Sequence, residues 1–342
     1  INELFEESLD SPKDYVQVIR EYLTPFFETL SDAIPEKLSQ CIVSGNEIQT
    51  IASMCNATNS LDFSIMERTA FTKMYKKAKE KGTEAISMEY DIPQEEVEVL
   101  LPSLIVLNRL LKYTVNDSIL LSNVLLSDAV MFEMLFPKEA SFVVKAYEEF
   151  TLQSATSIAE RFGRDIGHIS RVSSVALEIY DKMKKLHGYK LRERTLLQVS
   201  AILQDIGKYV NVKNHALLSY NTITNLDIVG INDHERLIIA TVCYYHNGNI
   251  PSMDSPIYNQ LSQEDRVMVS KLAAILQISN AINTSHSPKF EQVSVNMKNG
   301  KLNIYLTTLK NINLEKWAFI AKTKLFREVY GLNATIIKRG VL

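Results

Sequence analysis

Side chains that could hold a metal ion gather in the second half of the chain. His168 supplies an imidazole and Asp205 a carboxylate, and all six histidines lie at or after position 168. Neutral imidazoles and carboxylates are ligands of divalent metals, and a bound metal can activate water for hydrolysis. Metal-dependent hydrolysis is therefore the first chemistry to consider.

The metal site that these residues predict is a degenerate one, formed by His168 and Asp205. Gln204 precedes Asp205, and Asn280 follows later in the chain, so both positions carry an amide in place of a carboxylate or an imidazole. An amide is a weaker ligand and carries no charge. We therefore expect weak metal binding at His168 and Asp205 and no tightly bound transition metal. The alternative is a hydrogen bond between His168 and Asp205 that fixes two helices.

A second candidate site lies at Ser44, Gly45 and Asn46, where a predicted strand over residues 37–43 turns into a helix. The free N–H groups and the positive dipole end of a helix suit a phosphate group, and glycine permits close approach of the backbone. Glu47 places a negative charge where such an anion would lie. The alternative is an ordinary capped helix start.

The elements that must position these residues change in kind along the chain. Residues 1–137 alternate helix and strand, which is typical of α/β organisation. Residues 145–288 are nearly all helical, because apolar residues recur every three or four positions. The tail alternates apolar and polar residues around Asn299-Gly300, which predicts a β-hairpin, followed by a helix over 314–329 and a strand over 334–338.

Composition excludes several classes of protein. The net charge is −3, so no overall basic field would draw nucleic acid. The three cysteines are far apart and predict reduced thiols in a cytoplasmic protein, and no apolar run is long enough to span a membrane. The chain opens on Ile1 without a methionine, and we expect a natural N-terminal part to precede it.

The order of the motifs resembles that of a known family. Ile42-Val43-Ser44-Gly45 resembles the phosphate loop of exopolyphosphatases, and Val99-Leu100-Leu101-Pro102-Ser103 resembles a further segment of that family. His168, Gln204-Asp205-Ile206-Gly207, Tyr245-His246 and the helix over 276–283 follow in the order of an HD-type metal phosphohydrolase domain. Together these segments resemble the Ppx/GppA family of exopolyphosphatases and guanosine pentaphosphate phosphohydrolases.

The resemblance implies a fold, a cofactor and partners. It implies part of a second actin-like, sugar kinase/Hsp70-like lobe over residues 1–140, an HD-like helical domain over 141–288 and a small α+β domain over 289–342. The family's first domain, with its catalytic carboxylate, would lie outside this chain. Members bind polyphosphate or guanosine pentaphosphate with Mg²⁺ along a basic channel, which His215 and His246 would line, and they form homodimers.

Departures from the family pattern leave the function open between three hypotheses. Asn46-Glu47 replaces a Gly-Thr pair, Asp128 stands near a phosphate-binding arginine position, and Ser127 predicts a helix N-cap instead. The first hypothesis is a phosphoanhydride hydrolase. The second is an inactive sensor of polyphosphate or nucleotide, or a dimerising scaffold. The third is an HD-type metal phosphohydrolase acting on nucleotides, against which Gln204 and Asn280 argue.

The remaining histidines and the single tryptophan are interpreted as structural residues. His187, His234 and His286 are predicted to be surface or capping residues, and Trp317 to belong to the core.

Overall fold

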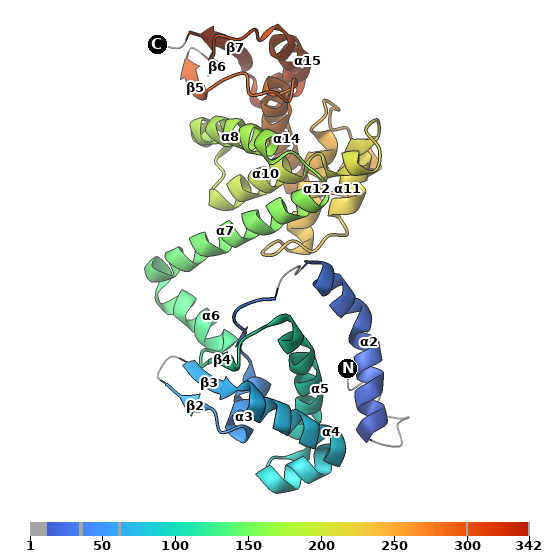
Figure 1. The fold of residues 1–342 in the computed structure, drawn as a ribbon. Coiled ribbons are helices and arrows are strands. Elements are labelled where there is room, and N and C mark those ends of the chain that lie inside the picture. Colours follow the sequence, from blue (N-terminus) through green and yellow to red (C-terminus); the bar gives the residue numbers. More distant parts are fainter. Residues whose placement is uncertain (1–11, 34–36, 61–62, 299, 341–342) are drawn as a thin grey trace. The chain divides into compact units, whose positions relative to one another are not determined.

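The computed structural model describes residues 12–33, 37–60, 63–298 and 300–340 (Figure 1). They form two compact units, residues 1–140 and 141–342, which are described separately. Both units combine helices with a small sheet, so the mixed α/β and helical composition that the sequence predicts is confirmed.

Unit 1 packs helices against a four-stranded mixed sheet. The strand order is β1-β4-β3-β2, with β1 parallel to β4 and the other pairs antiparallel. Its elements are α2 (Pro12–Ala33), β1 (Ile42–Val43), α3 (Asn46–Met54), β2 (Thr58–Asn59), β3 (Phe63–Glu67), α4 (Arg68–Tyr90), α5 (Gln94–Leu110), the 3-10 helix η1 (Leu111–Tyr113), β4 (Ser118–Ser122) and α6 (Leu126–Leu135).

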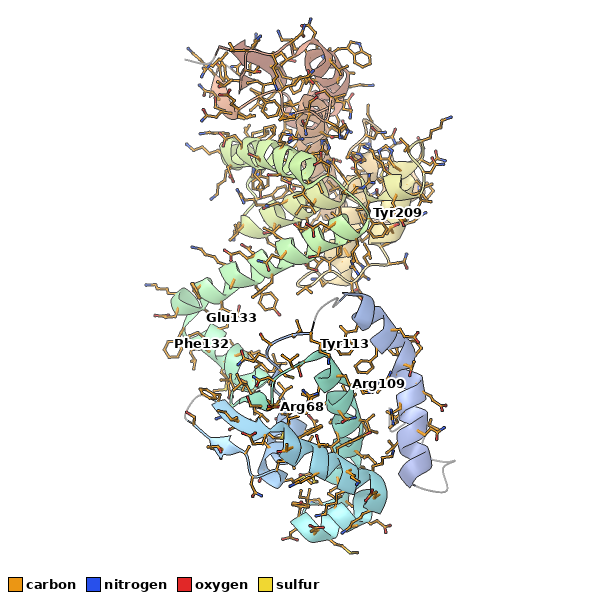
Figure 2. All side chains as sticks on the ribbon, in the orientation of Figure 1. Arg68, Arg109, Tyr113, Phe132, Glu133 and Tyr209 are labelled. Atoms are coloured by element: carbon orange, nitrogen blue, oxygen red, sulfur yellow. The ribbon has the colours of Figure 1, made fainter. Side chains whose placement is uncertain are left out.

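The core of unit 1 forms where α5 packs on α4 and α3. Leu104 and Ile105 of α5 and Ile119 of β4 are buried in one hydrophobic cluster, because α5 directs an apolar stripe into this core. Arg68, at the start of α4, donates to the carbonyl oxygens of Leu111, Thr114 and Asn116 over 2.6–3.2 Å. Figure 2 shows Arg68 within this unit, where it ties α4 to the end of α5.

Unit 2 is a helical bundle that carries a three-stranded sheet of order β5-β6-β7. The β5–β6 pair is antiparallel and the β6–β7 pair parallel. Its elements are α7 (Pro137–Arg161), which begins just before the unit boundary, α8 (Ile166–Lys182), α9 (Lys184–His187), α10 (Leu191–Leu203), the 3-10 helix η2 (Ile206–Tyr209), α11 (His215–Ile223), α12 (Asp233–Tyr245), α13 (Pro256–Asn259), α14 (Gln263–Ile282), β5 (Gln292–Lys298), β6 (Lys301–Thr307), α15 (Asn313–Tyr330) and β7 (Asn333–Arg339).

Helix α14 is the central element of this bundle. It packs against α8, α10, α12 and α15, and its apolar residues are buried on nearly every side. One hydrophobic cluster runs from α7 through α14 to β6 and α15. The division at residues 288 and 289 that the resemblance implies therefore stays a prediction, since helices and sheet share one core.

Several local expectations are confirmed and others are wrong. The predicted hairpin is confirmed by the pairing of β5 with β6 on either side of its turn, of which Asn299 lies outside the described residues. The helix and strand that follow it are confirmed by α15 and β7. Strands β2 and β3 were not foreseen. Ser127 is not an N-cap: α6 begins at Leu126, and the Leu125 N–H donates to the Asp128 carboxylate over 2.9 Å. Trp317 is 70% exposed and does not belong to the core.

Candidate metal centre

The ends of four helices bring one carboxylate and three imidazoles together in unit 2. His168 lies in the first turn of α8, Asp205 follows the end of α10, His215 begins α11, and His246 follows α12. All four side chains are buried, and His246 is 0% exposed. The convergence of His168 and Asp205 was predicted. The burial of His215 and His246 beside them was not, since His246 was expected on the surface side of a helix end.

Asp205, His215 and His246 form the tightest part of this cluster. Each offers one ligand atom, and these atoms lie within 4.8 Å of one another. The Asp205 Oδ1 atom is 3.3 Å from His246 Nε2 and 3.7 Å from His215 Nε2, and the two Nε2 atoms are 3.3 Å apart. Such a carboxylate with two imidazoles is a donor set that Zn²⁺, Mn²⁺ and Fe²⁺ accept.

Backbone hydrogen bonds fix which nitrogen of His215 and of His246 faces the cluster. His215 Nδ1 lies 2.7 Å from the Val212 carbonyl oxygen, and His246 Nδ1 bonds the Cys243 carbonyl oxygen. A carbonyl only accepts, so each Nδ1 carries a hydrogen, and each Nε2 presents a lone pair whenever its ring is neutral. Metal-binding histidines are oriented in this way. Three electron pairs therefore converge, and only a proton or a metal ion could bridge them.

His168 has the opposite arrangement. Arg171 Nε donates to Asn283 Oδ1 over 3.3 Å, so the Asn283 Nδ2 group faces His168 and donates to its Nδ1 over 2.7 Å. In this tautomer His168 Nε2 carries the hydrogen, and it points to Asp205 Oδ2 across 3.8 Å, too far for a hydrogen bond. Hydrogen bonding thus favours His215 and His246 over His168 as metal ligands.

The electrostatics of the cluster keep Asp205 ionised. Burial would raise the pKa of Asp205, but His246 and Lys208 outweigh it and hold that pKa below its ordinary value. Lys208 Nζ lies 2.7 Å from Asp205 Oδ2. Burial lowers the pKa of His168 to about 4, with a further contribution from His286, whose ring stacks on His168 with centroids 4.0 Å apart. His168 is therefore neutral at pH 7, which is the protonation state required both of a metal ligand and of a neutral hydrogen-bond donor.

Gln204 is not part of the ligand set. Its side chain is buried, and neither amide atom has a hydrogen-bond partner among the described residues. The amide position expected at Asn280 is filled by Asn283, one turn later, which contacts His168.

The glycine of the Asp205-Ile206-Gly207 segment allows α11 to approach Asp205. A Cβ on Gly207 would lie 2.3 Å from the carbonyl oxygen of His215. The Gly207 N–H donates to Ser219 Oγ over 2.9 Å, and Ser219 Oγ donates to the Gln204 carbonyl over 2.8 Å. The close packing of Gly207 therefore sets the position of His215.

Of the three histidines predicted to be surface or capping residues, His234 and His286 are exposed and His187 is buried. His286 stacks on His168 at the cluster. His187 is buried and bonds the Tyr180 carbonyl oxygen through Nε2 over 2.9 Å. His234 bonds the Asp265 carboxylate over 3.0 Å. Of the residues missed altogether, Lys208 had a signal, because it lies three positions after Asp205 in the same short turn.

The predicted phosphate loop lies in unit 1, where Gly45 precedes the first residue of α3. Gly45 has a φ of 136°, a conformation that favours glycine. The Glu47 carboxylate reaches back to within 3.6 Å of a Cβ placed on Gly45, so a negative charge does lie at this loop. Ser44, Gly45 and Asn46 remain predicted phosphate-binding residues.

Comparison with known proteins gives one family match. The model of the Ppx/GppA phosphatase, domain III, matches residues 152–325, just over half of the chain. This range contains all four residues of the cluster, from His168 to His246. No helix in the described part of the chain is both long and apolar enough to cross a membrane. The order of motifs, the helical fold of unit 2 and the family match agree, and the chain belongs to the Ppx/GppA phosphatase family.

Proposed function

We propose that this chain acts in the hydrolysis of terminal phosphoanhydride bonds of polyphosphate or of guanosine pentaphosphate. The observation that carries the proposal is the family match over residues 152–325. Mg²⁺ would accompany the polyanionic substrate, because it neutralises charge on the phosphoryl oxygens. Unit 1 would be the second actin-like lobe, with phosphate held at Ser44, Gly45 and Asn46. Its parallel β1–β4 pair and the turn from β1 into α3 support that assignment.

We propose in addition that Asp205, His215 and His246 hold a divalent metal ion, in place of the weak site at His168 and Asp205. Two lone pairs fixed by backbone carbonyls and one ionised carboxylate fit such an ion. The expectation of no tight metal counted only Gln204 and Asn280, whereas the fold supplies two further imidazoles. A bound ion would polarise a phosphoryl oxygen or lower the pKa of water. His168 would offer its Nε2–H as a neutral donor beside it.

Metal content tests this second proposal. We expect purified wild-type protein, loaded with Mn²⁺ or Zn²⁺ and desalted, to retain about one equivalent of metal by mass spectrometry. His246→Ala should abolish retention, and His168→Gln, which removes only the predicted donor, should leave it nearly intact. Equal loss in both variants, or no retention by the wild type, would reject the assignment.

An inactive sensor of polyphosphate or nucleotide is the second candidate function. The observation that favours it is negative charge at the predicted phosphate loop, where Glu47 reaches back to Gly45, and at the turn that replaces the family's phosphate-binding arginine, where Asp128 caps α6. Phosphate release from polyphosphate and from guanosine pentaphosphate, measured with Mg²⁺, separates the two functions. Release above the blank that disappears in a Gly45 variant supports the hydrolase. Binding of either polyanion without release supports the sensor.

A further inference from the structure

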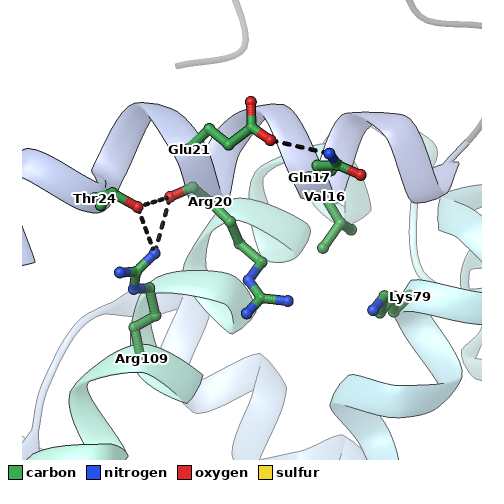
Figure 3. Close-up of a pocket in the computed structure, with 7 residues that line it drawn as sticks. All are labelled: Val16, Gln17, Arg20, Glu21, Thr24, Lys79 and Arg109. Carbon is green, nitrogen blue, oxygen red and sulfur yellow. Dashed lines mark hydrogen bonds between the residues drawn. The ribbon is translucent and has the colours of Figure 1, made fainter.

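A cavity of about 480 Å³ opens between α2, α4 and α5 of unit 1. Figure 3 shows Arg20 extending from α2 and Lys79 from α4 into the same space, with Arg109 of α5 beside them. The remaining lining residues are Val16, Gln17, Glu21 and Thr24. Three cationic side chains from three different helices therefore line one cavity.

These cations lack the carboxylate partners that basic side chains usually find. No ion pair joins Arg20, Lys79 or Arg109 to a carboxylate among the described residues, although other basic residues of the chain are paired. Glu21 is the one acidic residue of the lining, and its carboxylate accepts a hydrogen bond from Gln17 over 2.9 Å. The lining thus carries an excess of positive charge, and the like charges of its three cations repel one another.

Three contacts of Arg109 hold the cavity in shape. Arg109 Nη1 donates to the Arg20 carbonyl oxygen over 2.9 Å and to Thr24 Oγ1 over 3.0 Å, and the guanidinium lies over the Phe27 ring. These bonds occupy one of its amino groups and leave other N–H donors free. The guanidinium is therefore fixed in position before any ligand arrives.

A neutral donor lies close to the same cations. The Tyr75 hydroxyl is buried and has no hydrogen-bond partner among the described residues. Burial raises the pKa of the Tyr75 hydroxyl, and the positive charges of Arg20 and Arg109 partly offset that rise. A buried hydroxyl without a partner costs free energy, which an acceptor oxygen would recover.

We propose that this cavity binds a phosphate-bearing anion, through Arg20, Lys79 and Arg109. Guanidinium groups match the oxygens of phosphate in geometry, and a lysine adds a compact charge. The cavity is large enough for a short phosphate chain or for the phosphates of a nucleotide. The proposal does not rest on hydrolysis, because it concerns binding by unit 1 alone.

Calorimetric titration of the full chain with inorganic tripolyphosphate and with GTP tests the site. We expect Arg20→Gln and Lys79→Gln each to weaken binding about tenfold or more. Lys76→Gln, which removes the same charge from an exposed position of α4, should change it less than about twofold. Similar affinities for the two ligands would identify the phosphate chain as the recognised group, and tighter GTP binding would identify a nucleotide.

Thermal unfolding gives a readout that does not depend on calorimetry. Removing an unpaired cation relieves repulsion, so Arg20→Gln and Lys79→Gln should unfold at or above the wild-type temperature in buffer alone. Both variants should also lose the increase in unfolding temperature that tripolyphosphate produces in the wild type. Absence of binding by the wild type, binding that survives in the Arg20→Gln/Lys79→Gln double variant, or equal weakening by Lys76→Gln would each overturn the proposal.

Discussion

Replacing Gly207 with alanine should separate His215 from Asp205 and destabilise unit 2. The new Cβ would lie 2.3 Å from the carbonyl oxygen of His215 and 2.5 Å from the Ser219 nitrogen, where ordinary contact begins near 3.4 Å. Both atoms belong to the backbone of α11, so no side chain can turn aside to make room. The helix would have to retreat by roughly 1 Å, and His215 would move with it.

The magnitude follows from the contacts that this shift breaks. Overpacking of a close contact costs about 1–3 kcal/mol. The two hydrogen bonds of Ser219, to the Gly207 N–H and to the Gln204 carbonyl, add about 1 kcal/mol each if they are lost. We therefore expect Gly207→Ala to lower the free energy of unfolding by about 3–5 kcal/mol, a large fraction of the stability of a domain.

Urea unfolding followed by far-ultraviolet circular dichroism measures this loss. Two glycines serve as controls. Gly331 has a φ of 67° but open space around it, so Gly331→Ala should cost about 1 kcal/mol through backbone strain alone. Gly340 has neither a close neighbour nor a positive φ, so Gly340→Ala should be nearly neutral. An unfolding midpoint for Gly207→Ala equal to that of Gly340→Ala would refute the packing argument.

Three further predictions concern pH, hydrogen bonding and assembly. Burial lowers the pKa of His168 to about 4, so neutral His168 should contribute up to about 3 kcal/mol to the free energy of unfolding above pH 6.5, and this contribution should be lost as the pH falls towards 4. Urea unfolding midpoints measured from pH 4 to 7 should therefore fall less steeply with decreasing pH in His168→Gln than in the wild type. An identical slope in the two proteins would contradict the prediction. Arg68→Lys should destabilise unit 1 by about 2 kcal/mol, because a single ammonium group cannot donate to all the carbonyl oxygens that the guanidinium reaches. A urea unfolding midpoint within error of the wild-type value would count against this prediction. The chain should form a homodimer through residues 145–288, giving a mass near twice 38.8 kDa by light scattering that survives dilution, whereas a constant mass near 38.8 kDa would reject the dimer.

Local patterns in the sequence were sufficient for most of the elements. The step of three or four between apolar residues located α8 and α14, and the alternation around Asn299-Gly300 located the β5–β6 hairpin. These signals depend on neighbours in the chain, since a side-chain period follows directly from backbone geometry. The short strands β2 and β3 were not predicted, because a strand of so few residues shows no clear alternation of apolar and polar side chains.

The sequence also determined which residue types would be available for the site, but not which would meet. The sequence predicted that His168 and Asp205 would lie close together, and the structure confirms it, with 3.8 Å between His168 Nε2 and Asp205 Oδ2. It treated His215 and His246 as channel residues, whereas the packing of α10, α11 and α12 buries both beside Asp205. Contacts between residues 31 or more positions apart depend on how helices cross, and no local pattern encodes that. The carbonyls that orient His215 and His246 lie only three residues away in the chain. The orientation of His168 depends on Asn283, 115 residues away, so only the tertiary structure could decide which of its nitrogens keeps the lone pair.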